Sequence, residues 1–366
     1  MRLKKGPPDF VLFISALTLL GIGLIMVFSS SAVTANVNYG DAYYFFKKQL
    51  MWAVISVIAM LIVMKLNFSR LRDFAVPLMA IAILCLMLVI TPLGMDVKGS
   101  SRWFNLGFFR FSPSEFAKVA VVMFLARSLD IKLDKISSFT KGVLPFLVML
   151  VLICGLIMLQ PDLGTSFTIA ATVFFMLMVA GAQWIHLGLI TLSGIVAVAA
   201  AIILEPYRME RVTAFMNPWK YASDEGFQTI QSLYALGSGG LFGMGLGRSR
   251  QKFFYLPEQH TDFIFAILGE ELGFIGACLV VTLFLLFAWR GFKIAINAPD
   301  NFSRLLAAGV TIMITFQAAI NIGVVSGALP VTGITLPFIS YGGTSLLFTM
   351  IGVGLLLNIS RYSSQS

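Results

Sequence analysis

The sequence predicts an all-α integral membrane protein with about ten transmembrane helices and with both termini in the cytoplasm. Hydrophobic residues make up 58% of its 366 residues, whereas charged residues make up only 12%. The apolar residues form runs of about 20 residues, which is the length that crosses the hydrocarbon of a bilayer as a helix. Lysines and arginines gather in the connections on one side of these runs. We therefore expect a single polytopic membrane domain over residues 1–366.

Each expected span is one of these apolar runs. The first follows Arg2, Lys4 and Lys5, and its length, with further spans after it, favours an uncleaved helix over a signal peptide. An even number of spans places both ends of the chain on the same side of the membrane. The expected spans cover residues 10–30, 46–66, 75–92, 114–129, 143–160, 163–182, 186–204, 262–289, 305–326 and 343–359.

The distribution of basic residues predicts the orientation. The N-terminus, the connections at 65–72, 127–141 and 290–304, and Arg361 share one face, which the positive-inside rule makes cytoplasmic. This signal explains much of the net charge of +9, so no nucleic-acid partner is required. Basic residues also occur on the outer face, where they favour an anionic ligand or head group. These outer residues are Lys47, Lys48, Lys98, Arg102 and Arg110.

Two segments interrupt the regular pattern. Residues 205–261 form a large extracytoplasmic loop between the seventh and eighth spans, and this loop is too long to be a simple connection. Residues 327–342 contain Pro330 and Pro337, which prevent a continuous helix, although the segment is apolar enough to stay near the membrane. Irregular backbone at that depth requires burial in protein or contact with water. We therefore expect residues 327–342 to border a cavity, and whether they re-enter the membrane is left open.

Glu115 and Lys118 form the first unusual charged group. Ser112 suits the N-cap of the fourth span, Pro113 its first helical position, and Glu115 the end of a capping box. Lys118 lies three residues after Glu115, on the same face and inside the hydrocarbon. An ammonium group there costs several kcal/mol unless it is paired or faces water. We expect a functional ion pair, with snorkelling of Lys118 towards the surface as the alternative.

Asp262 begins the eighth span. Thr261 or Asp262 could act simply as the N-cap of this helix. The span of about 28 residues is, however, about 42 Å long, against about 30 Å of hydrocarbon, so its first turns can stand at the outer rim. A carboxylate, a Glu–Lys pair and several arginines at one interface suit chemistry on a lipid-linked pyrophosphate. Such chemistry needs a general base and cations for the leaving group.

Other polar and sulfur-containing residues suggest structural roles. The three cysteines each lie alone in a span, so no disulfide or thiolate metal site is indicated. The glycine-rich run at 235–251 follows no strand and lacks the ending of a nucleotide-binding loop. We expect packing or capping roles for His186, Glu270 and Glu271.

Four long motifs resemble the SEDS family (shape, elongation, division and sporulation) of membrane peptidoglycan polymerases. The resemblance covers essentially the whole chain, and it is closer to the division and sporulation branches (FtsW and SpoVE) than to the elongation branch (RodA). One departure from the family pattern is KYASDEG at 220–226. The matching motifs are Ser100 to Ala120, PDLGTS from Pro161 to Ser166, Asn217 to Gly273, and PVTGITLPFISYGGTS from Pro330 to Ser345.

The resemblance implies a glycosyltransferase that polymerises lipid II and releases undecaprenyl pyrophosphate. It implies catalytic roles for Asp262, Glu115 and Lys118, with Asp262 as general base or as ligand of a divalent cation such as Mg²⁺ or Mn²⁺. It also implies a class B penicillin-binding protein, a transpeptidase, as partner, and an outward-facing active site in the bacterial cytoplasmic membrane. The expected substrate-binding residues are Arg102, Lys48, Gln231, Ser232, Arg248, Lys252, Glu258, His260, Thr261, Ser340 and Tyr341.

Two other functions fit part of the same pattern. Ten spans with broken helices and buried charge also suit a transporter that flips lipid II. The charges cluster at the outer rim rather than at the midplane, and no inverted repeat is evident, which favours the enzyme. A scaffold that only recruits a transpeptidase would leave the Glu115–Lys118 pair without a purpose.

Overall fold

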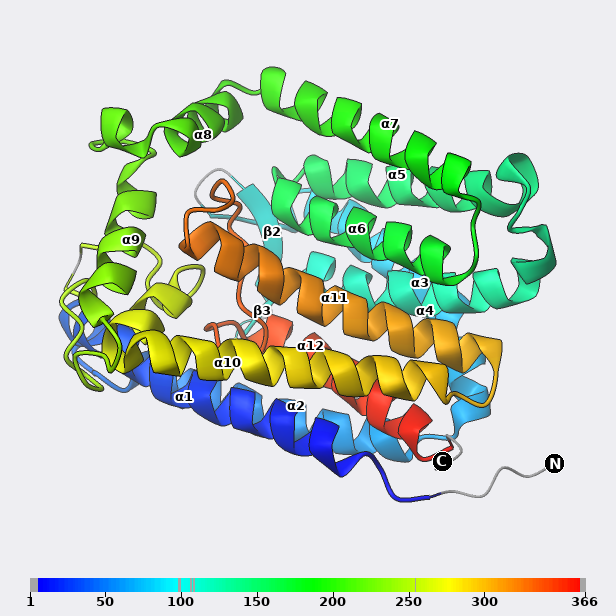
Figure 1. Cartoon of the computed structure of the whole chain (residues 1–366), viewed down its shortest axis with the longest axis horizontal. Coiled ribbons are helices and arrows are strands. Elements are labelled where there is room, and N and C mark those ends of the chain that lie inside the picture. Colours follow the sequence, from blue (N-terminus) through cyan, green and yellow to red (C-terminus); the bar gives the residue numbers. More distant parts are fainter. Residues whose placement is uncertain (1–5, 98–99, 106, 108, 254, 363–366) are drawn as a thin grey trace.

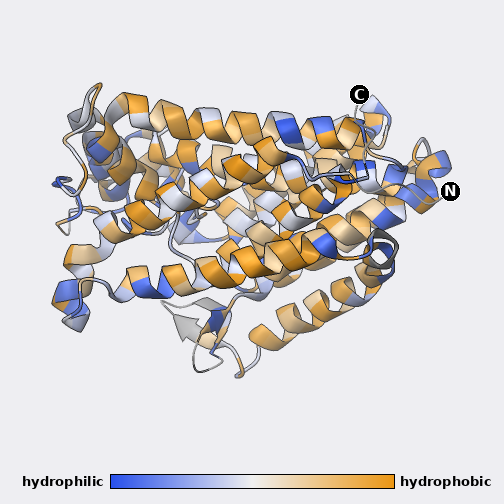
Figure 2. Cartoon of the chain, turned by 90° about the horizontal axis from the view of Figure 1, so that it is seen from below, coloured by the Kyte–Doolittle hydropathy of each residue, from blue (hydrophilic) through white to orange (hydrophobic). Residues whose placement is uncertain are grey.

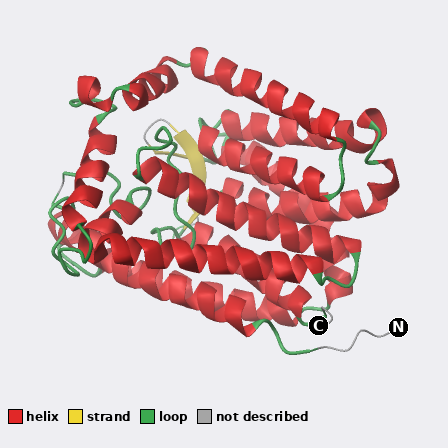
Figure 3. Ribbon diagram, in the orientation of Figure 1, coloured by secondary structure: helices red, strands yellow, loops and turns green. Residues whose placement is uncertain are grey.

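The computed structural model describes residues 6–97, 100–105, 107, 109–253 and 255–362. Lys98, one of the basic residues expected on the outer face, lies outside these ranges. Most of the described chain is helical, and most of the long helices run side by side along one direction (Figures 1 and 3). The backbone N–H of Gly6 donates to the carbonyl of Arg361 at 2.7 Å, so the two described ends of the chain lie together. We call this end of the bundle the terminal end.

The elements follow in chain order. They are α1 (Phe10–Tyr39), α2 (Tyr44–Lys65), α3 (Phe68–Val89), β1 (Met95–Val97), β2 (Ser100–Asn105), β3 (Arg110–Phe111), α4 (Pro113–Lys132), η1 (Leu133–Lys135), η2 (Phe139–Val143), α5 (Leu144–Met158), α6 (Leu163–Val179), α7 (Trp184–Ile203), α8 (Pro206–Met216), η3 (Pro218–Tyr221), α9 (Phe227–Gly239), α10 (Ile264–Ile296), α11 (Asn301–Val325) and α12 (Gly343–Ser360).

Every expected span falls on one of these helices. Within the described residues, eight helices are long and apolar enough to cross a membrane, namely α1, α2, α3, α5 with η2, α7, α10, α11 and α12. The other two expected spans coincide with α6, an apolar helix of 17 residues, and with α4, which carries several charged residues. Hydrophilic residues gather towards the two ends of the bundle (Figure 2). The all-α membrane class is therefore confirmed, whereas the count of ten spans stays a prediction.

The core of the bundle lies around α11 and α12. In their most apolar windows, 78% of the residues of α11 and 72% of those of α12 are buried, against 11% for α7 at the edge of the molecule (Figure 1). Helix α11 packs against α10, α4 and α6. Its buried face includes the amides Gln317 and Asn321, which lie in the last third of the helix.

A small sheet connects α3 to α4. Strand β2 pairs antiparallel with β1 on one side and with β3 on the other. Strands of two to six residues carry too weak a pattern to be recognised in the sequence, and they were not expected. The sheet matters for the site because β2 carries Arg102.

The expected large loop at 205–261 is folded against the bundle. Its first part contains α8, η3 and α9, and its glycine-rich part packs against a break in α10 at Gly273, where φ is 69° and ψ is −169°. The break leaves backbone groups of α10 without helical partners, and the loop supplies them. Phe274 and Ile275 donate to the carbonyls of Gly240 and Leu241 at 2.8 and 3.2 Å, and Met244 and Gly245 donate to those of Glu270 and Glu271 at 2.9 and 3.0 Å.

Residues between Val325 and Gly343 form no helix and no strand. Without a regular ladder, the carbonyls of this segment must find other partners if they are buried. Several of them bind side chains of α2 and α11, as described below. This irregular segment, residues 327–342, is therefore held in the bundle by side-chain hydrogen bonds.

Candidate functional site

Asp262 lies directly before the eighth expected span and is held by the irregular segment. Asn321 Nδ2 donates to the backbone carbonyl of Asp262 at 2.7 Å. A Cβ atom placed on Gly333 would lie 3.7 Å from Asp262 Oδ2, so this carboxylate borders the irregular segment directly. The N-cap of α10 is Phe263, and it makes no side-chain cap. Neither Thr261 nor Asp262 is therefore the N-cap of α10.

Two more contacts join the Asp262 segment to the irregular segment. Ser340 Oγ donates to the carbonyl of Thr261 at 2.6 Å, and the backbone N–H of Tyr341 donates to the carbonyl of His260 at 2.9 Å. Gln49 of α2, which is fully buried, donates to the carbonyl of Ser340 at 3.2 Å and accepts from the N–H of Gly342 at 3.2 Å. The backbone around Asp262 is thus fixed by residues from α2, α11 and the irregular segment.

The environment of Asp262 raises the pKa of its carboxyl group towards neutral pH. Burial, with the negative charge of Glu258 adding to it, raises the pKa of Asp262 to about 7. Arg102 and Arg211 act in the opposite direction, and the carboxylate of Asp162 raises the pKa further. A carboxyl group with such a pKa can accept and release a proton near neutral pH, as a general base must.

Arg102 of β2 binds the turn between α5 and α6. Its Nε donates to the carbonyl of Gln160 at 3.0 Å, a terminal nitrogen donates to the carbonyl of Pro161, and the other terminal nitrogen lies 3.9 Å from Asp162 Oδ2. Asp162 itself caps α6 by accepting from the N–H of Thr165 at 3.0 Å. The guanidinium group of Arg102, which was expected as a cation of the site, is therefore held near Asp262 by backbone carbonyls.

Glu115 and Lys118 form the expected ion pair. Lys118 Nζ lies 2.9 Å from Glu115 Oε2, and the lysine side chain is only 6% exposed. The same ammonium group donates to Gln317 Oε1 at 2.7 Å, so it points into the bundle and does not snorkel. Pro113 occupies the first turn as expected, but the N-cap Ser112 makes no side-chain cap. The predicted capping box is wrong because Glu115 binds Lys118 instead.

Lys252, one of the expected substrate-binding residues, is paired with an acidic residue of the protein itself. Its ammonium group lies 3.0 Å from Glu271 Oε1, and both side chains are buried. Glu271 also accepts from Ser29 Oγ, and Glu270 accepts from Ser249 Oγ and from the N–H of Arg250. These carboxylates bind the 249–252 turn to α10, which agrees with the packing role expected for Glu270 and Glu271.

The remaining expected substrate-binding residues divide into two groups. Glu258, His260, Thr261, Ser340 and Tyr341 lie in the two segments that meet at Asp262. His260 packs against the rings of Phe45 and Tyr341, at centroid distances of 4.6 and 5.7 Å, and burial lowers the pKa of its imidazole. Burial raises the pKa of Tyr341 to about 12, so its phenol stays protonated.

The second group has no described contact with Asp262. Ser232 is fully buried on α9, where its hydroxyl donates to the carbonyl of Val325 at 2.6 Å, and Gln231 beside it is half-buried. Arg248 is exposed in the glycine-rich turn. Lys48 is exposed at the start of α2 and donates to the hydroxyl of Tyr44 at 2.6 Å. A substrate-binding role for these four residues stays a prediction.

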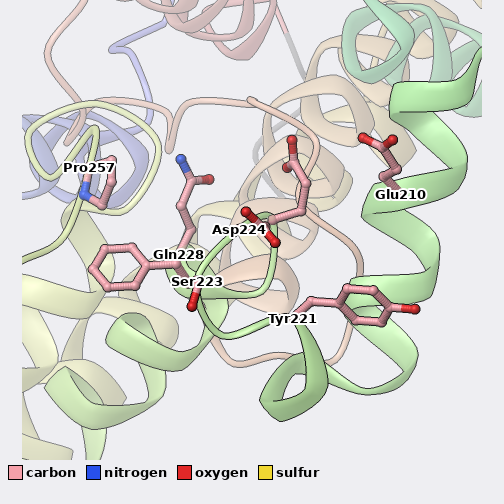
Figure 4. A pocket seen from close by; sticks show the side chains of 8 residues that line it. Glu210, Tyr221, Ser223, Asp224, Gln228 and Pro257 are labelled. Carbon is pink, nitrogen blue, oxygen red and sulfur yellow. The ribbon is translucent and has the colours of Figure 1, made fainter.

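A pocket of about 650 Å³ opens beside this site, between α8, η3 and the start of α9. Figure 4 shows Glu210 on one side, Pro257 on the other, and Asp224 and Gln228 between them. None of the described residues that line it is a lysine or an arginine, so the pocket is unsuited to a pyrophosphate. The lining residues are Glu210, Tyr221, Ser223, Asp224, Glu225, Phe227, Gln228 and Pro257.

The donor set at Asp262 restricts how a metal ion could bind. Across the part of the chain that the structure describes, no three histidine, cysteine or acidic side chains lie close enough together to hold one. A divalent cation would therefore need oxygen ligands from a substrate in addition to the Asp262 carboxylate.

Several residues of the site escaped the sequence analysis. Gln317 and Asn321 are polar residues four positions apart in an apolar span, and this spacing is a signal that could have been used. Asp162 lies in a motif that was recognised but was given no role. Gln49 and Arg211 carry no local signal, because their contacts come from segments distant in sequence.

Fold and site together define a polytopic membrane protein that holds a carboxylate, a buried ion pair and an arginine at the end of the bundle opposite the terminal end. The chain belongs to the FtsW/RodA/SpoVE family of bacterial membrane proteins, described as cell cycle proteins, whose model matches residues 10–365.

Two relatives and one solved structure illustrate this membership. The chain is 51% identical to Stage V sporulation protein E of Bacillus subtilis (strain 168), over 99% of this chain and 100% of that protein. It is 43% identical to a probable peptidoglycan glycosyltransferase FtsW of Trichlorobacter lovleyi, over 96% of this chain and 93% of that one. A chain from a peptidoglycan synthase complex, solved in work on the structural coordination of polymerization and crosslinking, superimposes with a TM-score of 0.81 at 32% identity, covering 98% and 99% of the two chains.

Proposed function

We propose that this protein is a peptidoglycan glycosyltransferase that polymerises lipid II, in cell division or sporulation, with its active site facing outward from the bacterial cytoplasmic membrane. Lipid II is the undecaprenyl-pyrophosphate-linked disaccharide pentapeptide. Support comes from the names of relatives such as the probable peptidoglycan glycosyltransferase FtsW, and from the chemistry of the residues around Asp262.

The depth order of the charged groups is the observation that carries this proposal. Asn321 contacts the backbone of Asp262, and Gln317, one turn earlier on α11, contacts Lys118. Helix α11 ends at Val325, so the amide that binds Lys118 lies about 6 Å further from this end of the helix than the amide that binds Asp262. Lipid II presents its groups in the same order, because the sugar is outermost, the pyrophosphate follows, and the lipid enters the hydrocarbon.

In the proposed reaction, Asp262 acts as the general base. It takes the proton from the 4-hydroxyl of the acceptor N-acetylglucosamine while that oxygen attacks C1 of the donor N-acetylmuramic acid. The bond between C1 and the pyrophosphate oxygen breaks, its electron pair leaves with undecaprenyl pyrophosphate, and the configuration at C1 is inverted. Lys118, oriented by Glu115, and Arg102 balance the charge that develops on the leaving group.

The proposal includes two further components. In the alternative role, Asp262 would be a ligand of a divalent cation such as Mg²⁺ or Mn²⁺, together with pyrophosphate oxygens, and the cation would help to neutralise the leaving group. A class B penicillin-binding protein would act as the transpeptidase partner. The similarity to a chain from a synthase complex that couples polymerization and crosslinking supports such a partner.

The test is polymerisation of purified lipid II in detergent by this protein with its cognate transpeptidase. We expect long glycan strands from the wild type and none from well-folded Asp262→Ala or Asp262→Asn. Asp41→Asn is a matched control, since Asp41 is an aspartate in the exposed connection between α1 and α2. Full activity of Asp262→Ala would exclude the proposed base, and lipid II translocation in vesicles without any polymer would favour a flippase.

A further inference from the structure

Two buried amides on α11, Gln317 and Asn321, lie between the residues proposed to act in catalysis. Gln317 is 4% exposed and Asn321 is 1% exposed, and they are separated by one helical turn. Residues four positions apart project from the same helix face, with their Cβ atoms about 6 Å apart. Burying an amide in an apolar span costs free energy unless its polar atoms form hydrogen bonds.

Each amide binds the irregular segment with one contact and the catalytic region with another. Gln317 Nε2 donates to the carbonyl of Thr335 at 2.9 Å, while its Oε1 accepts from Lys118 Nζ at 2.7 Å. Asn321 Nδ2 donates to the carbonyl of Ile334 at 2.7 Å and to that of Asp262 at 2.7 Å. The two carbonyls bound in the irregular segment are thus those of consecutive residues.

We propose that Gln317 and Asn321 are positioning residues that fix the separation between Lys118 and Asp262. Helix α11 is deeply buried, and the regular rise of the helix sets the distance between the two amides. The irregular segment has no ladder of its own, and its carbonyls at 334 and 335 are anchored to that face. The effect on catalysis rests on the proposed function, whereas the effect on the order of the two segments does not.

Only an amide satisfies the contacts at position 317. Its oxygen accepts from the ammonium group while its nitrogen donates to a backbone carbonyl. Glutamate at this position would keep the contact with Lys118 but could not donate to Thr335. It would also add a second negative charge beside Lys118, which already pairs with Glu115 at 2.9 Å. Gln317→Glu would therefore give the Lys118–Glu115 group a net negative charge, which would repel the leaving group.

Asn358 provides a matched control for a buried amide. This residue of α12 is fully buried, and its Nδ2 donates to the carbonyls of Val63, Met64 and Leu66 at 2.9, 3.1 and 2.9 Å. It lies near the terminal end, away from Asp262. Asn358→Ala thus measures the general cost of losing a buried amide that bridges backbone carbonyls.

The experiment compares Asn321→Ala, Gln317→Glu, Gln317→Met and Asn358→Ala in the complete protein with its transpeptidase. We expect kcat for lipid II polymerisation to fall about 10- to 100-fold in the three α11 variants, with KM changed less than about twofold. Asn358→Ala should lower the melting temperature and leave kcat nearly unchanged. Losses of kcat in the α11 variants no larger than in this control would overturn the proposal.

Hydrogen exchange separates this inference from the proposed function. Amide exchange in residues 258–262 and 329–341 should become faster in Asn321→Ala and stay unchanged in Asn358→Ala. If the wild type made no polymer, the proposed function would fail, and the exchange comparison would still decide whether these amides order the two segments. Unchanged exchange in Asn321→Ala would contradict positioning. If Asn321→Ala does not fold, Gln317→Met decides by the same measurement on residues 329–341.

Discussion

Lys252 and Glu271 form an ion pair that is buried from solvent. The ammonium group lies 3.0 Å from Glu271 Oε1, and the exposed fractions of the two side chains are 5% and 0%. Ser29 Oγ of α1 also donates to Glu271, at 2.7 Å from Oε1. One carboxylate therefore binds α1, α10 and the 249–252 turn together at the break in α10.

Removing one partner of this pair should destabilise the protein strongly. Lys252→Met leaves a buried carboxylate without its counter-ion, and the cost of such a change is about 3–5 kcal/mol. We expect a clear drop in the melting temperature in detergent, followed by tryptophan fluorescence. The double variant Lys252→Met/Glu271→Leu should recover part of the loss. Lys47→Met, which breaks the exposed pair with Asp41, is the control and should change little. An unchanged melting temperature for Lys252→Met would contradict the structure.

The rate of polymerisation should increase as the pH rises through about 7. The pKa of Asp262 is raised to about 7, mainly by burial, and the general base must be deprotonated to act. The initial rate with saturating lipid II should therefore follow a single titration from about pH 5.5 to a plateau near pH 8.5. A rate that is independent of pH in this range would argue against Asp262 as the base.

Two substitutions should move this titration in opposite directions. Glu258 raises the pKa of Asp262 and Arg102 lowers it. Glu258→Gln should therefore shift the midpoint of the pH–rate profile to lower pH, and Arg102→Met should shift it to higher pH. Arg102→Met should also lower kcat, because it removes a cation proposed to face the leaving group. Shifts in the same direction would mean that another group controls the profile.

Asp262 should destabilise the folded protein at alkaline pH. Its pKa in the folded state, about 7, lies above the ordinary value of 3.8. The stabilising contribution of the protonated group is complete below pH 3.8 and is lost as the pH rises through about 7. Asp262→Asn, which cannot ionise, should therefore melt at a higher temperature than the wild type at pH 8, by a margin that shrinks at pH 5. A margin that grows towards acidic pH would contradict this sign.

Gly243 should be required for the contact between the glycine-rich loop and α10. It has a φ of 80°, and a Cβ atom there would lie 2.2 Å from the carbonyl oxygen of Glu271. Gly247 is a matched control, because its φ is 79° and a Cβ atom there would meet nothing within 4 Å. We expect Gly243→Ala to lower the melting temperature much more than Gly247→Ala. Equal effects would show that only the backbone conformation matters.

The membrane spans could be predicted from the sequence because the thickness of the bilayer sets their length and composition. The Glu115–Lys118 pair could be predicted for a similar reason, since three residues along a helix bring two side chains to one face. The sheet around Arg102 was missed because its strands are too short to show a pattern. The capping box at Ser112 was wrong because Glu115 has a stronger partner in Lys118.

The contacts that organise the site depend on residues far apart in sequence. Lys118 and Gln317 are separated by 199 positions, and Asn321 and Asp262 by 59. A sequence pattern indicates that a buried lysine needs a partner, but it does not say which helix supplies one. For the same reason Lys252 was expected to bind substrate, whereas the packing of the loop against α10 brings it to Glu271.

The meeting of the two described chain ends has a practical consequence. Gly6 is hydrogen-bonded to Arg361, and the N–H of Asp9 donates to Ser360 Oγ at 3.0 Å, so the backbone almost closes into a ring. A short peptide could join these ends, and the chain could then be opened elsewhere as a circular permutant. Gly6 and Arg361 therefore mark one common point at the end of the bundle opposite Asp262.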